Sequence, residues 1–308
     1  MSVQIPQPQS DEHVFLIGRP PIEEYLGFLM VSANGQNLDR RALMDEWRLA
    51  NDHLKMLEQQ EAGWPDHPQI DDVPPHLHSL QAQVFADPMF QHAYDLLPAT
   101  IGMIELDRLV VYQKNINLNH VRRIQERLGA TPSEENLFRL CLPVDHEPPT
   151  VNGAWVAGNS YVFQSPSNDL RFHEPKLLSA EQITGYPPSG PVAGVLGLIA
   201  GFSPNYLQAL YVENRLILGN GSHRAYALRD MGIKHVPCVI LHVSRREELS
   251  LTGSPDVQQH PDRYLVAPRP PLLKDYFDQQ LRKLVAVPRK LRQVKLTIGI
   301  EVTDVPDR

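Results

Sequence analysis

The sequence predicts an α+β protein: a small mixed sheet with helices, extended by a helical N-terminal region and a long insertion. Three observations carry this prediction. Residues 216–240 have the pattern of a strand, a glycine turn, a helix and a second strand, and residues 104–128 have that of a strand followed by a helix. Before residue 98, apolar side chains recur mainly at helical spacing.

Residues 1–98 are predicted to form the helical N-terminal region, which begins with a polar, loose arm of about ten residues. The clearest helix spans 38–57, where Asp39 can cap the first turn and one face is apolar. Shorter helices are predicted at 77–85 and 89–97, the last one opening at Asp87-Pro88.

Residues 99–245 are predicted to form the central domain, interrupted by an insertion at 129–204 with strands at 154–156 and 160–164. Insertions of this length usually carry specificity or a partner surface. Residues 246–308 are predicted to be a C-terminal extension with a helix at 272–285 and a strand at 294–302.

The candidate site is the glycine turn Gly219-Asn220-Gly221. A hairpin with arms at 205–211 and 215–218, turned at Glu213-Asn214, delivers the chain into it. A glycine turn before a helix leaves backbone N–H groups unpaired at the positive end of the helix dipole, which favours anions. Ser222 stands in the expected cap position.

Two side chains after this turn suit phosphate. Arg224 can bind an anion with two donors, and His223 can donate to phosphate or move a proton. The alternative is a plain turn with a plain cap, in which both side chains are merely solvated. If the site does bind phosphate through Arg224, replacing Arg224 by alanine should weaken nucleotide binding without unfolding the protein.

The turn and its helix resemble the ParB/sulfiredoxin-like superfamily. Gly221-Ser-His-Arg is similar to the Gly-Cys-His-Arg of sulfiredoxins, the Gly-His-His-Arg of free-serine kinases and the Gly-Glu-Arg-Arg of ParB proteins. Gly232 and Val236-Pro237 match the glycine and the Val/Ile-Pro strand that follow in this superfamily. The resemblance implies that Gly219, Asn220, Gly221, Ser222, His223 and Arg224 bind nucleotide phosphates.

A second stretch, residues 104–113, resembles the opening strand of the same superfamily. Tyr112-Gln113 is similar to the start of the ParB Tyr-Gln-Pro-Arg motif, and this implies that Gln113 belongs to the nucleotide site. Free-serine kinases have a catalytic glutamate near this position, and an amide cannot replace it as a general base. Ser222 stands where sulfiredoxins have their cysteine, so sulfur redox chemistry is not expected.

The leading hypothesis is an ATP- or CTP-dependent phosphotransferase or NTPase with Mg²⁺ bridging the phosphates. His223 would act at the transferred group, and Glu105, Asp107 or Glu213 would hold metal or serve as base. A second hypothesis is a nucleotide-gated protein-interaction module of a bacterial DNA-maintenance or defence system, with a partner held by residues 1–98 or the insertion. The weakest is a ParB-like DNA-binding protein or nuclease.

Composition sets bounds on these hypotheses. The chain has 308 residues and a net charge of −7, which disfavours a protein that mainly coats nucleic acid. Residues 269–308 nevertheless hold nine Lys or Arg and five Asp or Glu, so a basic tail that contacts an acidic partner or nucleic acid stays open. Only two cysteines, no signal-peptide pattern and no apolar stretch of membrane-spanning length predict a cytoplasmic protein without a membrane partner.

Overall fold

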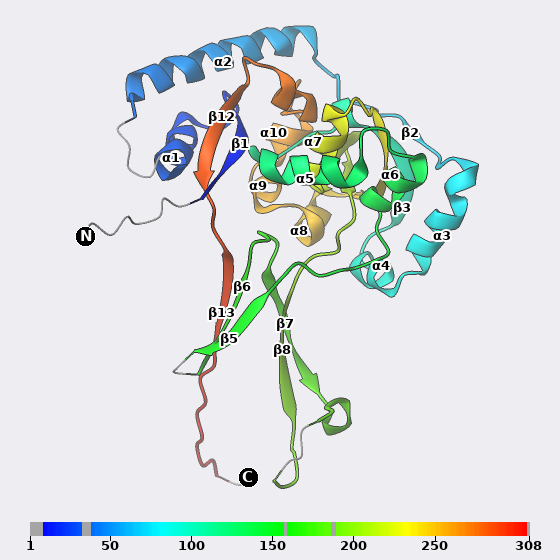
Figure 1. Cartoon of the computed structure of the whole chain (residues 1–308), viewed down its shortest axis with the longest axis vertical. Helices are drawn as coiled ribbons and strands as arrows, with labels where there is room; N and C mark the ends of the chain where they lie inside the picture. The colour runs from blue at the N-terminus through cyan, green and yellow to red at the C-terminus, as the bar shows by residue number, and fades with distance from the viewer. Residues whose placement is uncertain (1–8, 33–37, 157–158, 186–188, 307–308) are drawn as a thin grey trace. The chain divides into compact units, whose positions relative to one another are not determined.

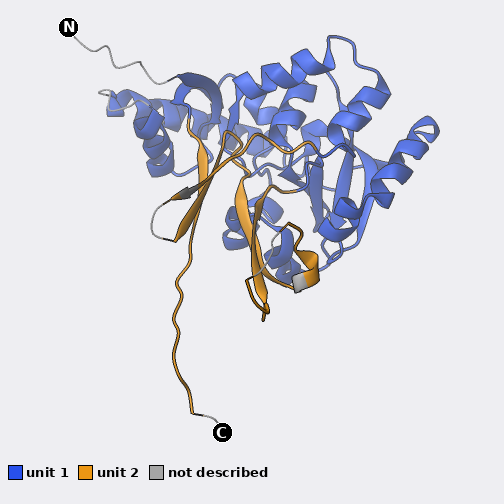
Figure 2. Cartoon of the chain, turned by 60° about the horizontal axis from the view of Figure 1, so that its bottom comes forward, with its two compact units in different colours: residues 1–146, 204–289 blue, residues 147–203, 290–308 orange. Residues whose placement is uncertain are grey.

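The computed structural model describes residues 9–32, 38–156, 159–185 and 189–306. The chain divides into two compact units (Figure 2): unit 1 comprises residues 1–146 and 204–289, and unit 2 comprises residues 147–203 and 290–308. The predicted boundaries at 98, 129 and 245 do not separate these units. The predicted loose arm lies at 1–10, of which residues 1–8 fall outside the described part.

Unit 1 is built on a five-stranded sheet with the order β10-β9-β11-β3-β2, of which Figure 1 labels β2 and β3. Its strands are β2 (Ile70–Asp71), β3 (Ala99–Glu105), β9 (Gln208–Val212), β10 (Arg215–Asn220) and β11 (His235–His242). β9 and β11 run parallel, whereas the other pairs are antiparallel. The predicted hairpin is confirmed, since Glu213 and Asn214 take left-handed φ angles of 46° and 63° between β9 and β10.

Three helices of unit 1 lie between the strands of this sheet in the sequence: α5 (Leu118–Leu128) and α6 (Glu134–Cys141) follow β3, and α7 (Ser222–Asp230) connects β10 to β11. α5 and α7 pack against each other. Their apolar residues join the large buried core of the unit, which includes Val121, Ile124, Ala225 and Leu228. The chain is therefore an α+β protein, as the sequence predicts.

The predicted strand at 104–113 is wrong in position. β3 ends at Glu105, a 3₁₀ turn η2 (Leu106–Arg108) follows, and Val110 then runs beside β10. Backbone hydrogen bonds of 2.9 Å join Val110 N–H to Leu216 O and Leu218 N–H to Val110 O. This arrangement carries the following residues toward the end of β10.

A second sheet in unit 1 joins distant parts of the chain in the order β12-β1-β4. It contains β1 (Ser10–Leu16), β4 (Asn115–Asn117) and β12 (Arg282–Pro288), all antiparallel. The predicted helix at 272–285 is therefore wrong: a short 3₁₀ helix η5 (Leu273–Phe277) precedes β12. β12 forms backbone hydrogen bonds with β1 along its whole length, and its local sequence does not predict this pairing.

The N-terminal helices agree better with prediction. They are α1 (Ile22–Ser32), α2 (Arg40–Gln60), η1 (Pro75–Leu77), α3 (His78–Ala86) and α4 (Pro88–Ala93). Asp39 caps α2 by accepting from the N–H groups of Arg41 and Ala42, as expected. Asp87 caps α4, but that helix ends at Ala93 rather than residue 97. These helices share unit 1 with the sheets, so residues 1–98 are not a separate unit.

The remainder of unit 1 is a run of short helices after β11: η4 (Arg246–Glu248), α8 (Leu249–Thr252), α9 (Pro255–Gln259) and α10 (Pro261–Leu265). Within the described residues, no helix is both long and apolar enough to cross a membrane.

The described residues of unit 2 form one short 3₁₀ helix and two small sheets. One has the order β13-β6-β5 and comprises β5 (Asn152–Val156), β6 (Ser160–Ser165) and β13 (Arg292–Thr297). The other is an antiparallel ribbon of β7 (Arg171–Leu178) and β8 (Val195–Gly201), with η3 (Ala180–Gln182) between them in the chain. The two strands predicted in the insertion are confirmed as β5 and β6, whereas β13 ends at Thr297 rather than residue 302.

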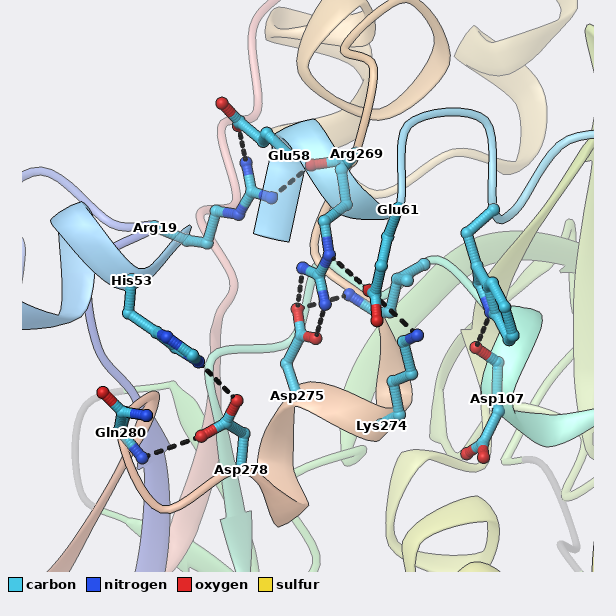
Figure 3. A network of polar contacts seen from close by, with 12 residues as sticks. Arg19, His53, Glu58, Glu61, Asp107, Arg269, Lys274, Asp275, Asp278 and Gln280 are labelled. Carbon is cyan, nitrogen blue, oxygen red and sulfur yellow. Dashed lines mark hydrogen bonds and ion pairs between the residues drawn. The ribbon is translucent and has the colours of Figure 1, made fainter. Parts of the chain in front are cut away.

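A buried ionic network ties the C-terminal segment of unit 1 to α2 and the loop after it (Figure 3). Arg269, which is 1% exposed, donates to both oxygens of Asp275 at 2.6 and 3.0 Å and to Glu61 at 2.8 Å. Lys274 also pairs with Glu61 at 2.9 Å. Burial by itself raises the pKa of Glu61, but the hydrogen bonds from Lys274 and Arg269 outweigh it, so this pKa is lowered.

Contacts of this kind also involve part of the basic tail, residues 269–308. Of the cationic residues that the structure describes in this tail, four form ion pairs with carboxylates: Arg269, Lys274, Lys283 and Arg289. Lys283 pairs with Glu46 of α2 and Arg289 with Asp11 of β1. Internal carboxylates therefore neutralise these four charges, and a contact of the tail with an acidic partner or nucleic acid stays a prediction.

Candidate functional site

The turn between β10 and α7 depends on glycine. Gly221 has a φ of 93°, in the left-handed region, and a Cβ at this position would lie 2.5 Å from Leu207 Cδ1. Gly221 is itself the N-cap of α7, and Ser222 is the first helical residue. Ser222 is therefore not the helix cap that its position in the sequence suggests.

A glycine N-cap leaves the first turn of α7 without side-chain acceptors. The first backbone bond into the helix runs from Ala225 N–H to Gly221 O at 2.9 Å. In the described part of the chain, the backbone N–H groups of Ser222, His223 and Arg224 have no hydrogen-bond acceptor. Three donors thus remain at the positive end of the helix dipole, and such an arrangement binds anions.

The structure brings Gln113 to this turn, as the sequence predicts. Ser222 Oγ lies 3.4 Å from Gln113 Oε1, although 109 positions separate the two residues. Two tyrosines hold the segment in place: Tyr112 Oη donates to Gly219 O at 2.8 Å, and Tyr276 Oη donates to Gln113 O at 2.5 Å. The amide and the hydroxyl therefore stand beside the open N–H groups.

His223 lies at the same end of α7, in a neutral state. Its Nε2 accepts a hydrogen bond of 3.0 Å from the backbone N–H of Asn117, so Nδ1 carries the ring proton. Burial, followed by the nearby His120, His13 and Arg224, lowers the pKa of His223 to about 3. His223 can donate through Nδ1, but its Nε2 is occupied and cannot act as a general base.

This lowered pKa predicts a pH-dependent stability. The unfolded chain takes up a proton on this histidine near pH 6.5, before the folded chain does, so the stabilisation is complete above about 6.5 and is lost as pH falls toward about 3. His223→Gln, whose side-chain oxygen can still accept from Asn117, should show a smaller loss. Urea unfolding of both proteins at about pH 7 and about pH 4.5 measures the difference, and equal losses would contradict the buried neutral state.

The Arg224 guanidinium lies beside the turn, since Nη2 and Nε are 3.1 and 3.3 Å from the position of a Cβ at Gly221. The Arg224 side chain is buried, and Nη1 donates to three backbone carbonyls: Asn205 at 2.7 Å, Leu140 at 3.1 Å and Cys141 at 3.2 Å. Burial lowers the pKa of this guanidinium. The contacts of Nη1 tie the end of α6 to the segment before β9. That Arg224 binds a phosphate stays a prediction.

The three candidate carboxylates lie elsewhere. Asp107 binds Arg229 at 2.6 Å, in the last turn of α7, which at 1.5 Å per residue is about 10 Å along the axis from Ser222. Glu105 pairs with Arg108 at 2.9 Å. Glu213 lies in the turn before β10, at the other end of that strand from Gly219, where a hydrogen bond from Arg246 lowers its pKa. The structure does not bring Glu105, Asp107 or Glu213 to His223.

The sequence did not single out Asn117 and His120, which border the site from α5. The His120 ring stands edge-on to His223 with centroids 5.1 Å apart. Asn117 caps α5 by accepting from the N–H groups of Asn119 and His120 at 2.9 and 3.1 Å. An asparagine before an amphipathic helix is a recognisable cap, so this part of the signal was present in the sequence.

The two neighbouring helix starts differ in one respect. Gln125 of α5 donates to Asp230 of α7 at 2.9 Å, and Asn117 meets His223, so the helices run in the same direction. At the start of α5 a carboxylate is already present, because Asp11 accepts from Asn117 and Asn119 at 2.9 and 2.8 Å. No carboxylate is hydrogen-bonded to the start of α7 within the described residues.

The donors at the α7 turn suit an anion rather than a metal ion. Mg²⁺ is held by carboxylates together with substrate phosphates, and the turn offers N–H groups, a hydroxyl, an amide and an imidazole. The described residues contain no group of three His, Cys, Asp or Glu side chains that could hold a metal. The predicted Mg²⁺ therefore finds no fitting ligand set here.

Comparison with known proteins leaves the family open. No protein-family model matches the chain, and neither curated proteins nor solved structures give a match. The resemblance of Gly221-Ser-His-Arg to the ParB/sulfiredoxin-like superfamily stays a prediction.

Proposed function

We propose that the chain is a nucleotide-binding module that holds a phosphate of ATP or CTP at the N-terminus of α7. The observation that carries this proposal is the set of three backbone donors at Ser222, His223 and Arg224, left open behind a turn that requires glycine at 221. Ser222 Oγ, which lies 3.4 Å from Gln113 Oε1, adds a neutral hydroxyl at the same helix start. The neighbouring helix α5 supports the proposal by contrast, since the Asn117 side chain already accepts from its first N–H groups and Asp11 accepts from the side-chain amides of Asn117 and Asn119.

Binding without phosphoryl transfer agrees best with this geometry. A transferase needs a base for the acceptor and carboxylates for the metal. Gln113 is an amide, His223 Nε2 is engaged, and Glu105 and Asp107 pair with arginines away from the turn. Among the predicted functions, the nucleotide-gated interaction module is therefore favoured over a phosphotransferase, an NTPase or a nuclease.

Ser222→Asp separates phosphate binding from helix stability. An aspartate in the first turn interacts favourably with the helix dipole. The free energy of unfolding should therefore stay unchanged or rise by roughly a few tenths of a kcal/mol. The same carboxylate competes with phosphate for the open N–H groups and repels it. Affinity for the nucleotide should fall at least about tenfold, because like charges meet at contact distance.

Calorimetric titration with ATP, ADP, CTP, GTP and inorganic phosphate, each with and without Mg²⁺, measures this effect. Asn136→Asp is the matched control, since it adds the same charge to the exposed first turn of α6 and should leave binding unchanged. If wild-type protein binds none of these ligands, or if Ser222→Asp binds them as wild type does, the proposed site is wrong.

A further inference from the structure

The chain continues past β13 as an extended segment whose apolar side chains are uncovered. Ile300, Val302 and Val305 are 80%, 90% and 80% exposed. The last backbone bond of this part joins Ile298 N–H to Asn159 O at 3.0 Å, and no hydrogen bond holds residues 299–306 within the described structure. The alternation of Ile298, Ile300 and Val302 is nevertheless that of a strand with one apolar face.

The ribbon of β7 and β8 in the same unit lacks a further strand at its edges. A two-stranded ribbon has two unpaired edges and is marginally stable by itself. Its register pairs Leu177 with Leu196, Pro175 with Leu198 and, across a bulge, Phe172 with Ala200. These side chains share one face, on which Leu177 and Leu196 are 76% and 62% exposed.

The charged side chains of β7 and of the segment favour pairing of the segment with the outer edge of β7. Arg171 and Lys176 lie on the opposite face of the ribbon. They pair with two glycines of β8, Gly201 and Gly197, and these positions alternate along the strand with its leucines. If Ile300 and Val302 of an added strand extend the apolar face, Glu301 falls on the face of Lys176. Pro175 removes one backbone donor from β7 and leaves those of its neighbours.

We propose that residues 298–305 add as a strand to the outer edge of β7 in a second copy of the chain, reciprocally, in a strand-exchanged dimer. A second copy is the occupant because residues 299–306 form no hydrogen bond with the ribbon of their own copy. Reciprocal exchange supplies the missing strand to both ribbons at once. This interface is independent of the phosphate site.

The first test is sedimentation equilibrium of the full chain. Wild type should dimerise, and Ile300→Lys should weaken dimerisation roughly a hundredfold, because two symmetry-related apolar contacts are replaced by charges. Leu49→Lys, at an aliphatic residue of α2 that is 72% exposed, is the control and should dimerise as wild type does. Circular dichroism checks that each variant is folded. A wild-type monomer at all concentrations overturns the proposal.

Charge reversal tests the exchange itself. Lys176→Glu and Glu301→Lys should each weaken the homodimer roughly tenfold, since each places like charges at two equivalent contacts. A mixture of the two variants should dimerise again, because each segment then meets a ribbon of opposite charge. Lys234→Glu controls for net charge. Pairing within one copy, or with a different protein, would leave the mixture monomeric and would refute the exchange.

Discussion

Arg224→Ala is expected to unfold the protein far more readily than any surface substitution, lowering the free energy of unfolding by about 4 kcal/mol or more. The guanidinium is buried and donates to Leu140 O, Cys141 O and Asn205 O. Its removal takes the Arg224 donor from Leu140 O and Asn205 O and opens a cavity, whereas Cys141 O keeps the N–H of Leu207 at 2.7 Å. Unsatisfied buried groups cost about 1–3 kcal/mol each, so their sum is a large share of a typical domain's stability.

Urea unfolding followed by circular dichroism measures this effect. Arg127→Ala is the matched control: this arginine is exposed on α5, and its removal should change the free energy of unfolding by less than about 0.5 kcal/mol. A variant Arg224→Ala that folds as wild type does but fails to bind nucleotide would support Arg224 as a phosphate ligand. The structural account of Arg224 would then be wrong.

The second large effect is expected in the buried ionic network of Figure 3. Arg269 and Asp275 are 1% and 2% exposed, and each is the other's main partner. Arg269→Met leaves Asp275 as a buried charge without its cationic partner, and Asp275→Leu leaves Arg269 with Glu61 as its remaining carboxylate. Breaking a buried pair in this way costs about 3–5 kcal/mol.

The double variant Arg269→Met with Asp275→Leu should lose less than the sum of the two single variants, because no isolated charge from this pair remains. The exposed pair of Arg48 and Asp45, at 62% and 58% exposure, is the control cycle and should couple by less than about 1 kcal/mol. Thermal and urea unfolding of all variants give the coupling energy. Single losses below about 1 kcal/mol would show that the network contributes little.

Local patterns were sufficient for the elements closest to the candidate site. Asn214 between two apolar runs favours the β9–β10 turn, because asparagine accepts a left-handed φ more readily than most residues, whereas Glu213 takes its φ of 46° without such a preference. Asp39 predicts the start of α2, since its side chain accepts from the N–H groups of its own helix. Gly221 predicts the turn into α7 for the same local reason.

Long-range pairing was not predictable from local patterns. The apolar spacing within 272–285 suits a helix, yet residues 282–288 pair with β1 at the other end of the chain. Likewise β7 and β8 lie in the insertion and pair with each other although a loop separates them in the sequence. Strand identity here depends on partners that lie far away in the sequence, so periodicity by itself cannot decide it.

The sequence by itself determined the α+β class, the hairpin, the glycine turn and the helix that follows it, because each depends on the conformations that neighbouring residues permit. Only the tertiary structure decided what the side chains at that turn do. It placed Arg224 on buried carbonyls, left His223 neutral beside Asn117, and sent Asp107 to the far end of α7. Burial and three-dimensional proximity set the charge and the partners of a side chain, and neither is encoded in its immediate neighbours.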